Sequence, residues 1–319
     1  MQLLRYTAKR ILQAVPLLLL ISILCFLLMK IAPYDAIDAI TTPNMSEETV
    51  AMLKEKNGLN EPVHIQYIYW LRGILQGELG YSIVTHESIA NDLMERIPNT
   101  IFLVLPAYTL ALVLSLILGS IAGYKKGRLA DKVIDGICSI GIAIPSFWLA
   151  MVVIYVFGYM LDLFPILGMT TAGVEESLAD KLHHLVLPGF VLMIAFLPEL
   201  TRYVRSSTIG QLSQDYVAVQ RAYGESDITI VFRHVLRNVL LPIVTIAGMS
   251  LPILVTGAIV TETVFGWPGI GPYFVKAIQG FDYPVVMAVM LISAALVIIG
   301  NLLADLLYVL IDPRIKEMR

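Results

Sequence analysis

Long apolar stretches separated by charged segments define the pattern of this chain. A helix that crosses a membrane needs about 20 consecutive apolar residues. Six stretches reach or approach that length, and they run roughly over residues 11–31, 99–123, 136–161, 185–201, 240–264 and 285–310. The fourth is the shortest and contains Pro188 and Pro198, which spans tolerate because neighbouring groups re-satisfy the freed backbone. The pattern predicts an all-α membrane protein with six transmembrane helices.

Composition agrees with a membrane protein, and neither nucleic-acid binding nor a cleaved signal peptide is indicated. The chain is 57% hydrophobic and 15% charged, with a mean hydropathy of +0.78, whereas an average soluble domain is about 45–50% apolar and about 25% charged. A net charge of −3 gives no indication of nucleic-acid binding. The first apolar run, Ile11 to Met29, is too long for a signal-peptide core and lacks a cleavage pattern, so we interpret it as an uncleaved first span.

The distribution of lysine and arginine predicts the orientation. Basic residues concentrate at residues 5–10, 125–132, 202–237 and 314–319, which alternate with the poorly basic connections. Because cytoplasmic loops carry an excess of Lys and Arg, both termini should be cytoplasmic. The predicted organisation is an N-terminal segment and first span at 1–31, an extracytoplasmic cap at 32–98, and a five-helix core at 99–319 that contains a cytoplasmic loop at 202–239.

The predicted cap has helical signals. Ser46 precedes Glu47 and Glu48 and is a candidate N-cap for one helix. Pro62 opens a second helical stretch that continues through Trp70. We therefore expect a small ordered cap rather than a linker.

The loop at 202–239 contains two helical patterns on either side of Gly224, which can adopt a positive φ and turn the chain sharply. In the second pattern the apolar residues share one side of a helix, and they are Val231, Phe232, Val235, Leu236, Val239 and Leu240. The opposite side carries Arg233, His234, Arg237 and Asn238. Physics alone leaves two interpretations open: a basic helix on the anionic inner leaflet, or an elbow that docks into a cytoplasmic partner.

This loop resembles the EAA loop of ABC importer permeases, in the form used by the dipeptide, oligopeptide and nickel branch. The resemblance implies that the loop couples to an ATPase subunit through Asp215, Tyr216, Arg221, Ala222, Gly224, Arg233, His234, Arg237 and Asn238. Leu236, Leu240 and Pro242 also match the branch. The chain departs from the pattern at Ala218, Val219 and Gln220, where the EAA triplet itself would stand, so these three are poor candidates for specific roles.

Further matches to the branch follow in order along almost the whole chain. They include Gly77-Glu78-Leu79-Gly80, Ile144-Pro145-Ser146-Phe147-Trp148, Glu262-Thr263-Val264-Phe265, Trp267-Pro268-Gly269-Ile270-Gly271, Asp282-Tyr283-Pro284 and Asp312-Pro313-Arg314. One departure is Ala32-Pro33-Tyr34-Asp35, where the branch usually has Pro-Gly-Asp-Pro.

The resemblance implies a type I ABC importer permease fold that forms half of a translocation pathway for short peptides. The same architecture importing nickel or a metal–metallophore complex is the alternative. The implied partners are a homologous second permease, two ATP-binding subunits, an extracytoplasmic substrate-binding protein and membrane lipid. The implied location is a bacterial or archaeal cytoplasmic membrane.

Motif absences agree with a transport subunit rather than an enzyme. The chain has no G-x-x-x-x-G-K-S/T, H-E-x-x-H or G-x-S-x-G motif, so we assign it no catalytic residue, cofactor or metal ligand, and expect a separate subunit to hydrolyse ATP. A secondary transporter would need coupling-ion residues at mid-membrane, and a membrane enzyme would need paired catalytic groups; the sequence shows neither. A structural anchor would not need the docking loop.

Polar residues near the predicted spans are candidates for a pathway or gate. We assign Glu262, Trp267, Asn301 and Asp305 to this class, with local structural pairing as the competing interpretation. Glu199 is three residues before Arg202, a spacing that allows a pair on one helix face. His183 and His184 suggest a metal site, but adjacent histidines point in different directions on a helix, so capping or hydration is the better interpretation.

Overall fold

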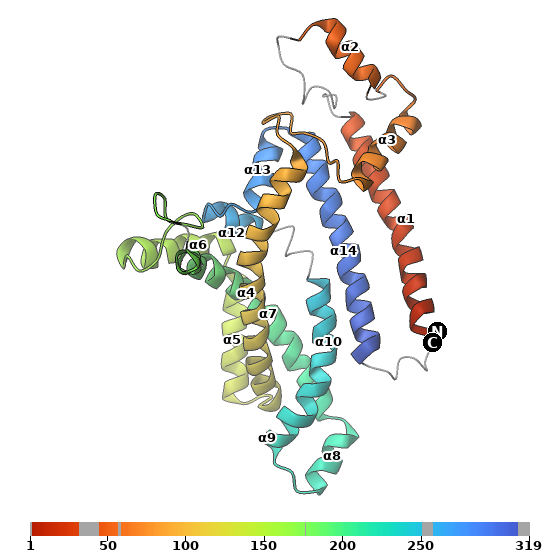
Figure 1. The fold of residues 1–319 in the computed structure, drawn as a ribbon. Helices are drawn as coiled ribbons and strands as arrows, with labels where there is room; N and C mark the ends of the chain where they lie inside the picture. The colour runs from red at the N-terminus through yellow and green to blue at the C-terminus, as the bar shows by residue number, and fades with distance from the viewer. Residues whose placement is uncertain (1, 32–44, 57–58, 176, 251–257, 312–319) are drawn as a thin grey trace.

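In the computed structural model, the described residues are 2–31, 45–56, 59–175, 177–250 and 258–311 (Figure 1). Regular structure in these ranges is helical, apart from one isolated β-bridge between Tyr81 and Ser88. The first half contains α1 Gln2–Ile31, α2 Glu47–Lys56, α3 Val63–Leu75, α4 Ile89–Tyr124, α5 Leu129–Ala143, α6 Ser146–Val153 and the π-helix η1 Ile154–Met160. The second half contains α7 Leu178–Leu212, α8 Asp215–Ala222, α9 Asp227–Thr229, the π-helix η2 Ile230–Val235, α10 Leu236–Met249, α12 Ile259–Val264, α13 Ile270–Gln279 and α14 Tyr283–Ile311.

Helices α4 and α7 form the centre of the fold and pack closely along their length (Figure 1). A Cβ atom added at Gly119 of α4 would lie 2.5 Å from Cβ of Val204 on α7, and one added at Gly123 would lie 2.7 Å from Cβ of Thr208. Small residues at these positions let the two backbones approach, which is how helices gain contact area inside a membrane. The apolar patterns at 99–123 and 185–201 predicted both helices, and the structure shows that they pack together.

Within the described ranges, four helices are long and apolar enough to cross a membrane: Leu12–Ile31, Ile89–Tyr124, Leu178–Leu212 and Tyr283–Leu303. The predicted straight span at 136–161 is instead a pair of segments, Leu129–Ala143 and Ser146–Met160, bent by 95°. The bend falls at Pro145, which cannot donate a backbone hydrogen bond and disfavours helical geometry at the preceding residue. The predicted span at 240–264 includes residues 251–257, which lie outside the described part of the chain.

Two helices extend beyond the predicted segment boundaries. Helix α4 begins at Ile89, so it crosses the expected limit of the cap at residue 98 and contains Pro98 and Pro106 in its interior. Helix α7 continues to Leu212, ten residues past the expected start of the loop at 202. A run of apolar residues marks the part of a helix that faces lipid. It does not show how far the helix continues beyond the lipid.

The two ends of the molecule carry different elements (Figure 1). Helices α2, α3 and α13 lie toward one end, and α8 and α9 form the opposite end. The two helices expected in the cap are confirmed: α2 begins after Ser46, whose Oγ accepts from the backbone N–H of Thr49 at 3.2 Å, and α3 begins directly after Pro62.

Candidate functional site

Residues 215–239 fold into a hairpin that projects from the end of α7 (Figure 1). Its first arm is α8 and its second arm is α9 followed by η2 and the start of α10. We call this segment the 215–239 hairpin. It contains every residue that the sequence assigned to the docking loop.

The turn of the hairpin is a Schellman motif at the end of α8. The N–H of Glu225 donates to the carbonyl of Gln220 at 3.2 Å, and the N–H of Gly224 donates to the carbonyl of Arg221 at 3.0 Å. Gly224 has φ +83°, the left-handed conformation predicted from the sequence. A Cβ atom there would meet nothing within 4 Å, so a substitution would strain the backbone without a steric clash.

The second arm begins with its own cap. The Oγ atom of Ser226 accepts from the N–H of Thr229 at 3.2 Å, which starts α9. The helix then widens into the π-turn η2 before α10. Each arm thus has a local stop or start signal, and the geometry of the turn is determined by residues close in sequence.

An ion pair links the two arms, and a second polar contact joins the turn to the second arm. Arg221 Nε donates to Asp227 Oδ1 at 3.0 Å, and Asp227 Oδ2 accepts from the Tyr124 hydroxyl at the end of α4 at 3.3 Å. His234 Nε2 lies 2.9 Å from Glu225 Oε2. Arg221 and His234 therefore have structural partners inside the hairpin as well as exposed surface.

The remaining predicted docking residues are distributed over the outer surface. Asp215 in the first turn of α8, Ala222, Arg233 and Arg237 are exposed, and Asn238 is half-buried. Tyr216 is half-buried and its hydroxyl donates to Gln211 Oε1 at 3.0 Å. The structure brings these residues onto one projecting element but leaves most of them open to a partner.

An apolar core holds the hairpin against the helices above it. Val217, Ile230, Val235, Val239 and Ile243 are buried together with Val204 of α7. These packed side chains join the hairpin to α7 and α10.

The tip of the hairpin exposes large apolar side chains. Tyr223 is 82% exposed, Ile228 65%, Phe232 56% and Val219 49%. Sequence analysis missed Tyr223 and Ile228, and treated Val219 as a poor candidate. It also grouped Phe232 with the apolar side of the second helix, whereas Phe232 is exposed within the π-helix η2.

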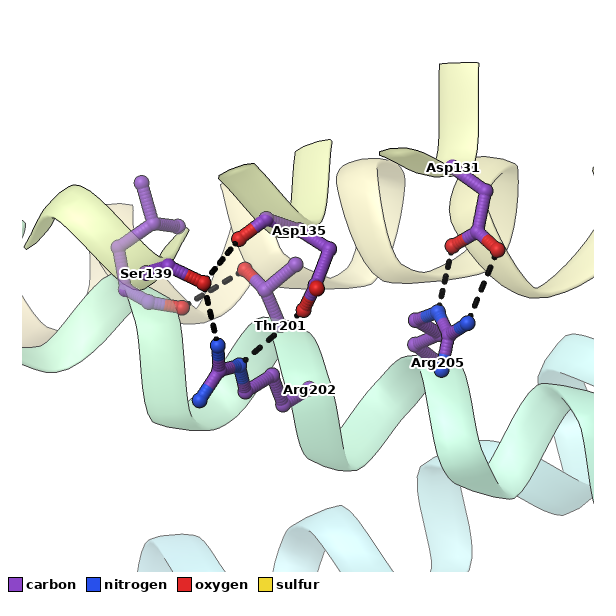
Figure 2. A network of polar contacts seen from close by, with 7 residues as sticks. Asp131, Asp135, Ser139, Thr201, Arg202 and Arg205 are labelled. Carbon is purple, nitrogen blue, oxygen red and sulfur yellow. Dashed lines mark hydrogen bonds and ion pairs between the residues drawn. The ribbon is translucent and has the colours of Figure 1, made fainter. Parts of the chain in front are cut away.

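A polar network joins α5 to α7, the helix that leads into the hairpin (Figure 2). Arg205 forms a bidentate pair with Asp131, through Nε at 2.5 Å and Nη2 at 2.9 Å, and Asp131 also accepts from the N–H of Gly127 at 2.8 Å. Arg202 lies 3.3 Å from Asp135. The Asp131–Arg205 pair joins the α4–α5 turn to the helix that leads into the hairpin.

Arg202 has partners that the sequence did not suggest. Its Nη2 atom donates to Ser139 Oγ at 2.7 Å, in addition to the pair with Asp135 (Figure 2). The expected pairing with Glu199 on the same helix face is therefore replaced by partners on α5. Pairing across helices depends on which faces meet, and spacing along one helix cannot show this.

Glu262 and Trp267 form a second cluster at the opposite end of the molecule. Both side chains are fully buried. Glu262 Oε2 accepts from the N–H of Gly271 in the first turn of α13 at 2.7 Å, while its Oε1 has no hydrogen-bond partner. Trp267 Nε1 donates to the carbonyl of Asn99 on α4 at 2.8 Å, and its ring stacks on Phe102.

Two more bonds tie this cluster to α4. Asn99 Nδ2 donates to the carbonyl of Pro268 at 3.0 Å, and Thr100 Oγ1 accepts from the N–H of Ile270 at 3.0 Å. The segment from α12 to α13 is therefore locked against the first half of α4. We call Asn99, Thr100, Glu262 and Trp267 the α4–α13 lock.

The other two pathway candidates lie elsewhere. Asn301 is an exposed residue of α14, 18 positions after Tyr283, so it stands about 27 Å along the helix from the end nearest α13. The side chain of Asp305 lies outside the described residues. The structure does not bring Asn301 together with Glu262 and Trp267.

The adjacent histidines have separate structural partners. His183 Nε2 lies 2.9 Å from the carbonyl of Leu163, and His184 Nδ1 lies 3.0 Å from the carbonyl of Asp180 in the first turn of α7. Among the described residues, no group of three or more His, Cys, Asp or Glu side chains is placed to hold a metal ion. Both ring nitrogens contact carbonyl oxygens, and the N-cap of α7 is Ser177, whose Oγ accepts from the N–H of Asp180.

Two family models match the sequence. The model described as binding-protein-dependent transport system inner membrane component matches residues 115–317, and the model for the N-terminal part of such membrane components matches residues 3–104. Together they include the 215–239 hairpin and the α4–α13 lock.

Curated relatives match over nearly the full length. The chain is 42% identical over 312 residues to the oligopeptide transport system permease protein AppB of Bacillus subtilis (strain 168), covering 98% of this chain and 99% of the relative. It is 32% identical over 313 residues to the glutathione transport system permease protein GsiC of Salmonella choleraesuis (strain SC-B67), with the same coverage.

A solved structure shares the fold. A chain of the MetNI methionine ABC transporter in inward facing conformations aligns with a TM-score of 0.54 at 17% identity, covering 69% of this chain and 96% of that chain. The type I permease fold expected from the sequence is confirmed.

Proposed function

The chain belongs to the family of binding-protein-dependent transport system inner membrane components, and from this premise we propose that it forms half of a peptide pathway driven by an ATPase docked on the 215–239 hairpin. A member of this family is a multi-pass permease subunit of an ABC importer, and a separate subunit hydrolyses ATP. Such a permease works with a partner permease, ATPase subunits and a substrate-binding protein. The proposal concerns the cargo, the docking surface and the gate.

The exposed apolar tip of the hairpin is the observation that carries the docking proposal. Tyr223, Ile228 and Phe232 project from a rigid turn at one end of the molecule. Aromatic side chains of this kind dominate binding energies when a partner's pocket buries them. Arg233 and Arg237 on the same element supply charge for orientation rather than most of the affinity.

The competing interpretation, a helix lying on the inner leaflet, fits the geometry less well. A leaflet helix needs one continuous apolar face along its length. Here the apolar face of the second arm is buried against α7, and the exposed apolar groups gather at the turn. A compact apolar tip on a projecting elbow suits a protein cleft.

The hairpin also has a route for transmitting motion. Its core packs on Val204 of α7, and the Asp131–Arg205 pair binds the same helix to α5. We propose that ATPase closure moves the hairpin, α5 and α7 as one body. The α4–α13 lock then serves as a gate element that keeps the opposite end of α4 fixed to α13.

Short peptides are the cargo we propose. The two relatives described above are named for oligopeptides and glutathione, which are peptides. Selection of the cargo belongs in this proposal to the binding protein, which meets the cap at the end opposite the hairpin. The nickel alternative has no supporting cluster among the described residues.

We further propose that the hairpin end is cytoplasmic and that the partner is a different, homologous permease. The excess of lysine and arginine in the segments at that end supports the orientation. Cysteine labels at Lys126 and at Thr49 test it: the first should react only from the cytoplasm and the second only from outside. Reaction at Lys126 from outside in intact cells contradicts the orientation.

A cross-linking experiment tests the docking surface directly. Tyr223→Cys in the assembled importer should form a disulfide with cysteines placed around the docking cleft of the ATPase subunit. Leu129→Cys, an equally exposed position outside the hairpin at the start of α5, is the matched control and should not cross-link. Cross-linking at Leu129 but not at Tyr223 would remove the hairpin as the docking element.

A further inference from the structure

We propose that α3 is embedded in the membrane leaflet beside α1, and that phospholipid covers its exposed face. The sequence placed this helix in an extracytoplasmic cap. Its depth in the membrane follows from where it contacts α1, and is independent of the cargo and of the ATPase contact.

The depth of the contact comes from α1, which crosses the membrane over Leu12–Ile31. Its first charged residue toward the α3 end is Lys30. A helix rises about 1.5 Å per residue, so Ser22 lies about 12 Å below Lys30 and close to the centre of a hydrocarbon layer about 30 Å thick. Whatever touches Ser22 reaches far below the membrane surface.

Helix α3 makes that contact. The Tyr67 hydroxyl lies 2.8 Å from Ser22 Oγ, and the Tyr67 ring lies 5.5 Å from the ring of Phe26 in an edge-to-face arrangement. Trp70 is 5.6 Å from Phe26 by ring centroids. In Figure 1 α3 lies against the upper part of α1 rather than beyond its end.

The chemistry of the hydroxyl pair suits an apolar environment. Ser22 Oγ donates to the carbonyl of Leu19 at 2.8 Å, so the Tyr67 hydroxyl is the donor to Ser22. Both hydroxyl groups are thus satisfied within the protein, as a layer without water requires. In an aqueous helix the Tyr67 hydroxyl could bond to water instead of to a serine in the middle of a span.

The outward face of α3 is apolar. Leu75 is 81% exposed, Ile68 57%, and Val63 and Tyr69 are also exposed. The only residue of fixed charge in the helix is Arg72, near its end, which can extend to the headgroups. Tyr69 and Trp70 are residue types concentrated at membrane interfaces.

Helix α2 provides the internal contrast. Its ten residues include Glu47, Glu48, Lys54, Glu55 and Lys56, the composition of a helix in water. The two helices belong to the same predicted cap, and α3 packs against the span α1. The cap therefore divides into an aqueous part and a part in the leaflet.

An open groove between α1 and α3 extends the lipid-facing surface. It has a volume of about 420 Å³ and is lined by Ile23, Phe26, Leu27, Val63, His64 and Tyr67. Most of this lining is apolar, and on α1 it covers the turns between Ser22 and Lys30. An acyl chain fits the chemistry of such a groove.

Spin-label accessibility tests the proposal. Ile68→Cys on α3 and Met52→Cys on α2 are labelled in a Cys25→Ala, Cys138→Ala background; both target side chains are exposed, so the labels do not disturb packing. The importer, assembled with its partner subunits, is placed in vesicles of phosphatidylethanolamine and phosphatidylglycerol. Collisions with oxygen, which partitions into lipid, are compared with collisions with a water-soluble nickel chelate.

We expect the label at Ile68 to lose accessibility to the nickel chelate while remaining accessible to oxygen, and the label at Met52 to show the reverse. A label at Tyr69 should repeat the result at Ile68. Nickel-chelate access at Ile68 would place α3 in water. Exclusion of both reagents would show that a protein partner covers it, and either result overturns the proposal. Neither outcome bears on the docking of the ATPase.

Discussion

The 215–239 hairpin and the α4–α13 lock match motifs of the same family, but their side chains are used in opposite ways. In the hairpin, large apolar groups such as Tyr223 are exposed and ionic groups pair locally. In the lock, Glu262 and Trp267 are fully buried and bonded to a distant helix. Apolar side chains that bind a partner stay exposed in the single chain. Apolar side chains that hold helices together are buried within the fold.

This contrast predicts that disruptive changes in the hairpin reduce transport and leave the protein folded, while disruptive changes in the lock reduce the amount of folded protein. The position that should affect uptake most is Gly224. Gly224→Asp forces an L-residue into φ +83°, at a local cost of about 1–2 kcal/mol, and redirects the second arm. We expect membrane abundance close to wild type and uptake of peptide abolished, measured with labelled substrate in cells.

The matched control for Gly224 is Gln220→Ala in the same turn. The backbone carbonyl of residue 220 accepts from the N–H of Glu225 and is retained in the alanine variant. Uptake should therefore be only mildly reduced. Normal uptake by Gly224→Asp would contradict the coupling role of the hairpin. Loss of membrane insertion on neutralising Arg233 and Arg237 together would instead favour the leaflet interpretation.

The next largest effect belongs to the lock. Trp267→Ala removes a fully buried ring that stacks on Phe102 and donates to Asn99, and such truncations cost about 3–5 kcal/mol of folding free energy. We expect a lower unfolding temperature in detergent and reduced abundance in the membrane. The protein that remains should still bind the ATPase subunit, because the hairpin is intact.

Trp148→Ala is the control for Trp267. Trp148 is 48% exposed, so its removal should leave the unfolding temperature nearly unchanged. Equal destabilisation by both substitutions would show that the loss of stability does not come from the buried contacts of Trp267 in the lock.

The exposed tip should produce an intermediate effect confined to partner binding. Tyr223→Ser removes an aromatic anchor that makes no contact within the chain's core, and anchors of this type contribute more than 1 kcal/mol to interfaces. We expect about a tenfold weaker affinity for the ATPase subunit, measured by titration of purified components, with an unchanged unfolding temperature. An unfolding temperature lowered as much as in Trp267→Ala would mean that Tyr223 packs within the fold.

The smallest effect should come from the exposed ion pair of the hairpin. Arg221 and Asp227 are both about half exposed, and pairs of this kind contribute about 0.2–1 kcal/mol. Asp227→Asn should therefore leave uptake within about threefold of wild type, and the difference should shrink in high salt. A loss as severe as that of Gly224→Asp would assign Asp227 a direct role at the ATPase contact.

The sequence by itself determined the class of the protein and the position of its main helices. Runs of apolar residues long enough to cross a membrane identify α1, α4, α7 and α14, because lipid contact requires apolar side chains all along a span. Local signals were equally reliable: Ser46 caps α2, Pro62 precedes α3, and Gly224 adopts a positive φ. Each depends only on residues a few positions away.

Tertiary structure alone decided the properties that depend on which faces meet. The pairing of Arg202 with Asp135, the burial of Glu262 against α13 and the depth of Tyr67 beside Ser22 all join residues on different helices, and the exposure of Phe232 occurs within the π-helix η2. Periodicity in one segment describes that segment's own faces. It carries no information about the neighbour that will cover them, so these contacts appear only when the helices are packed together.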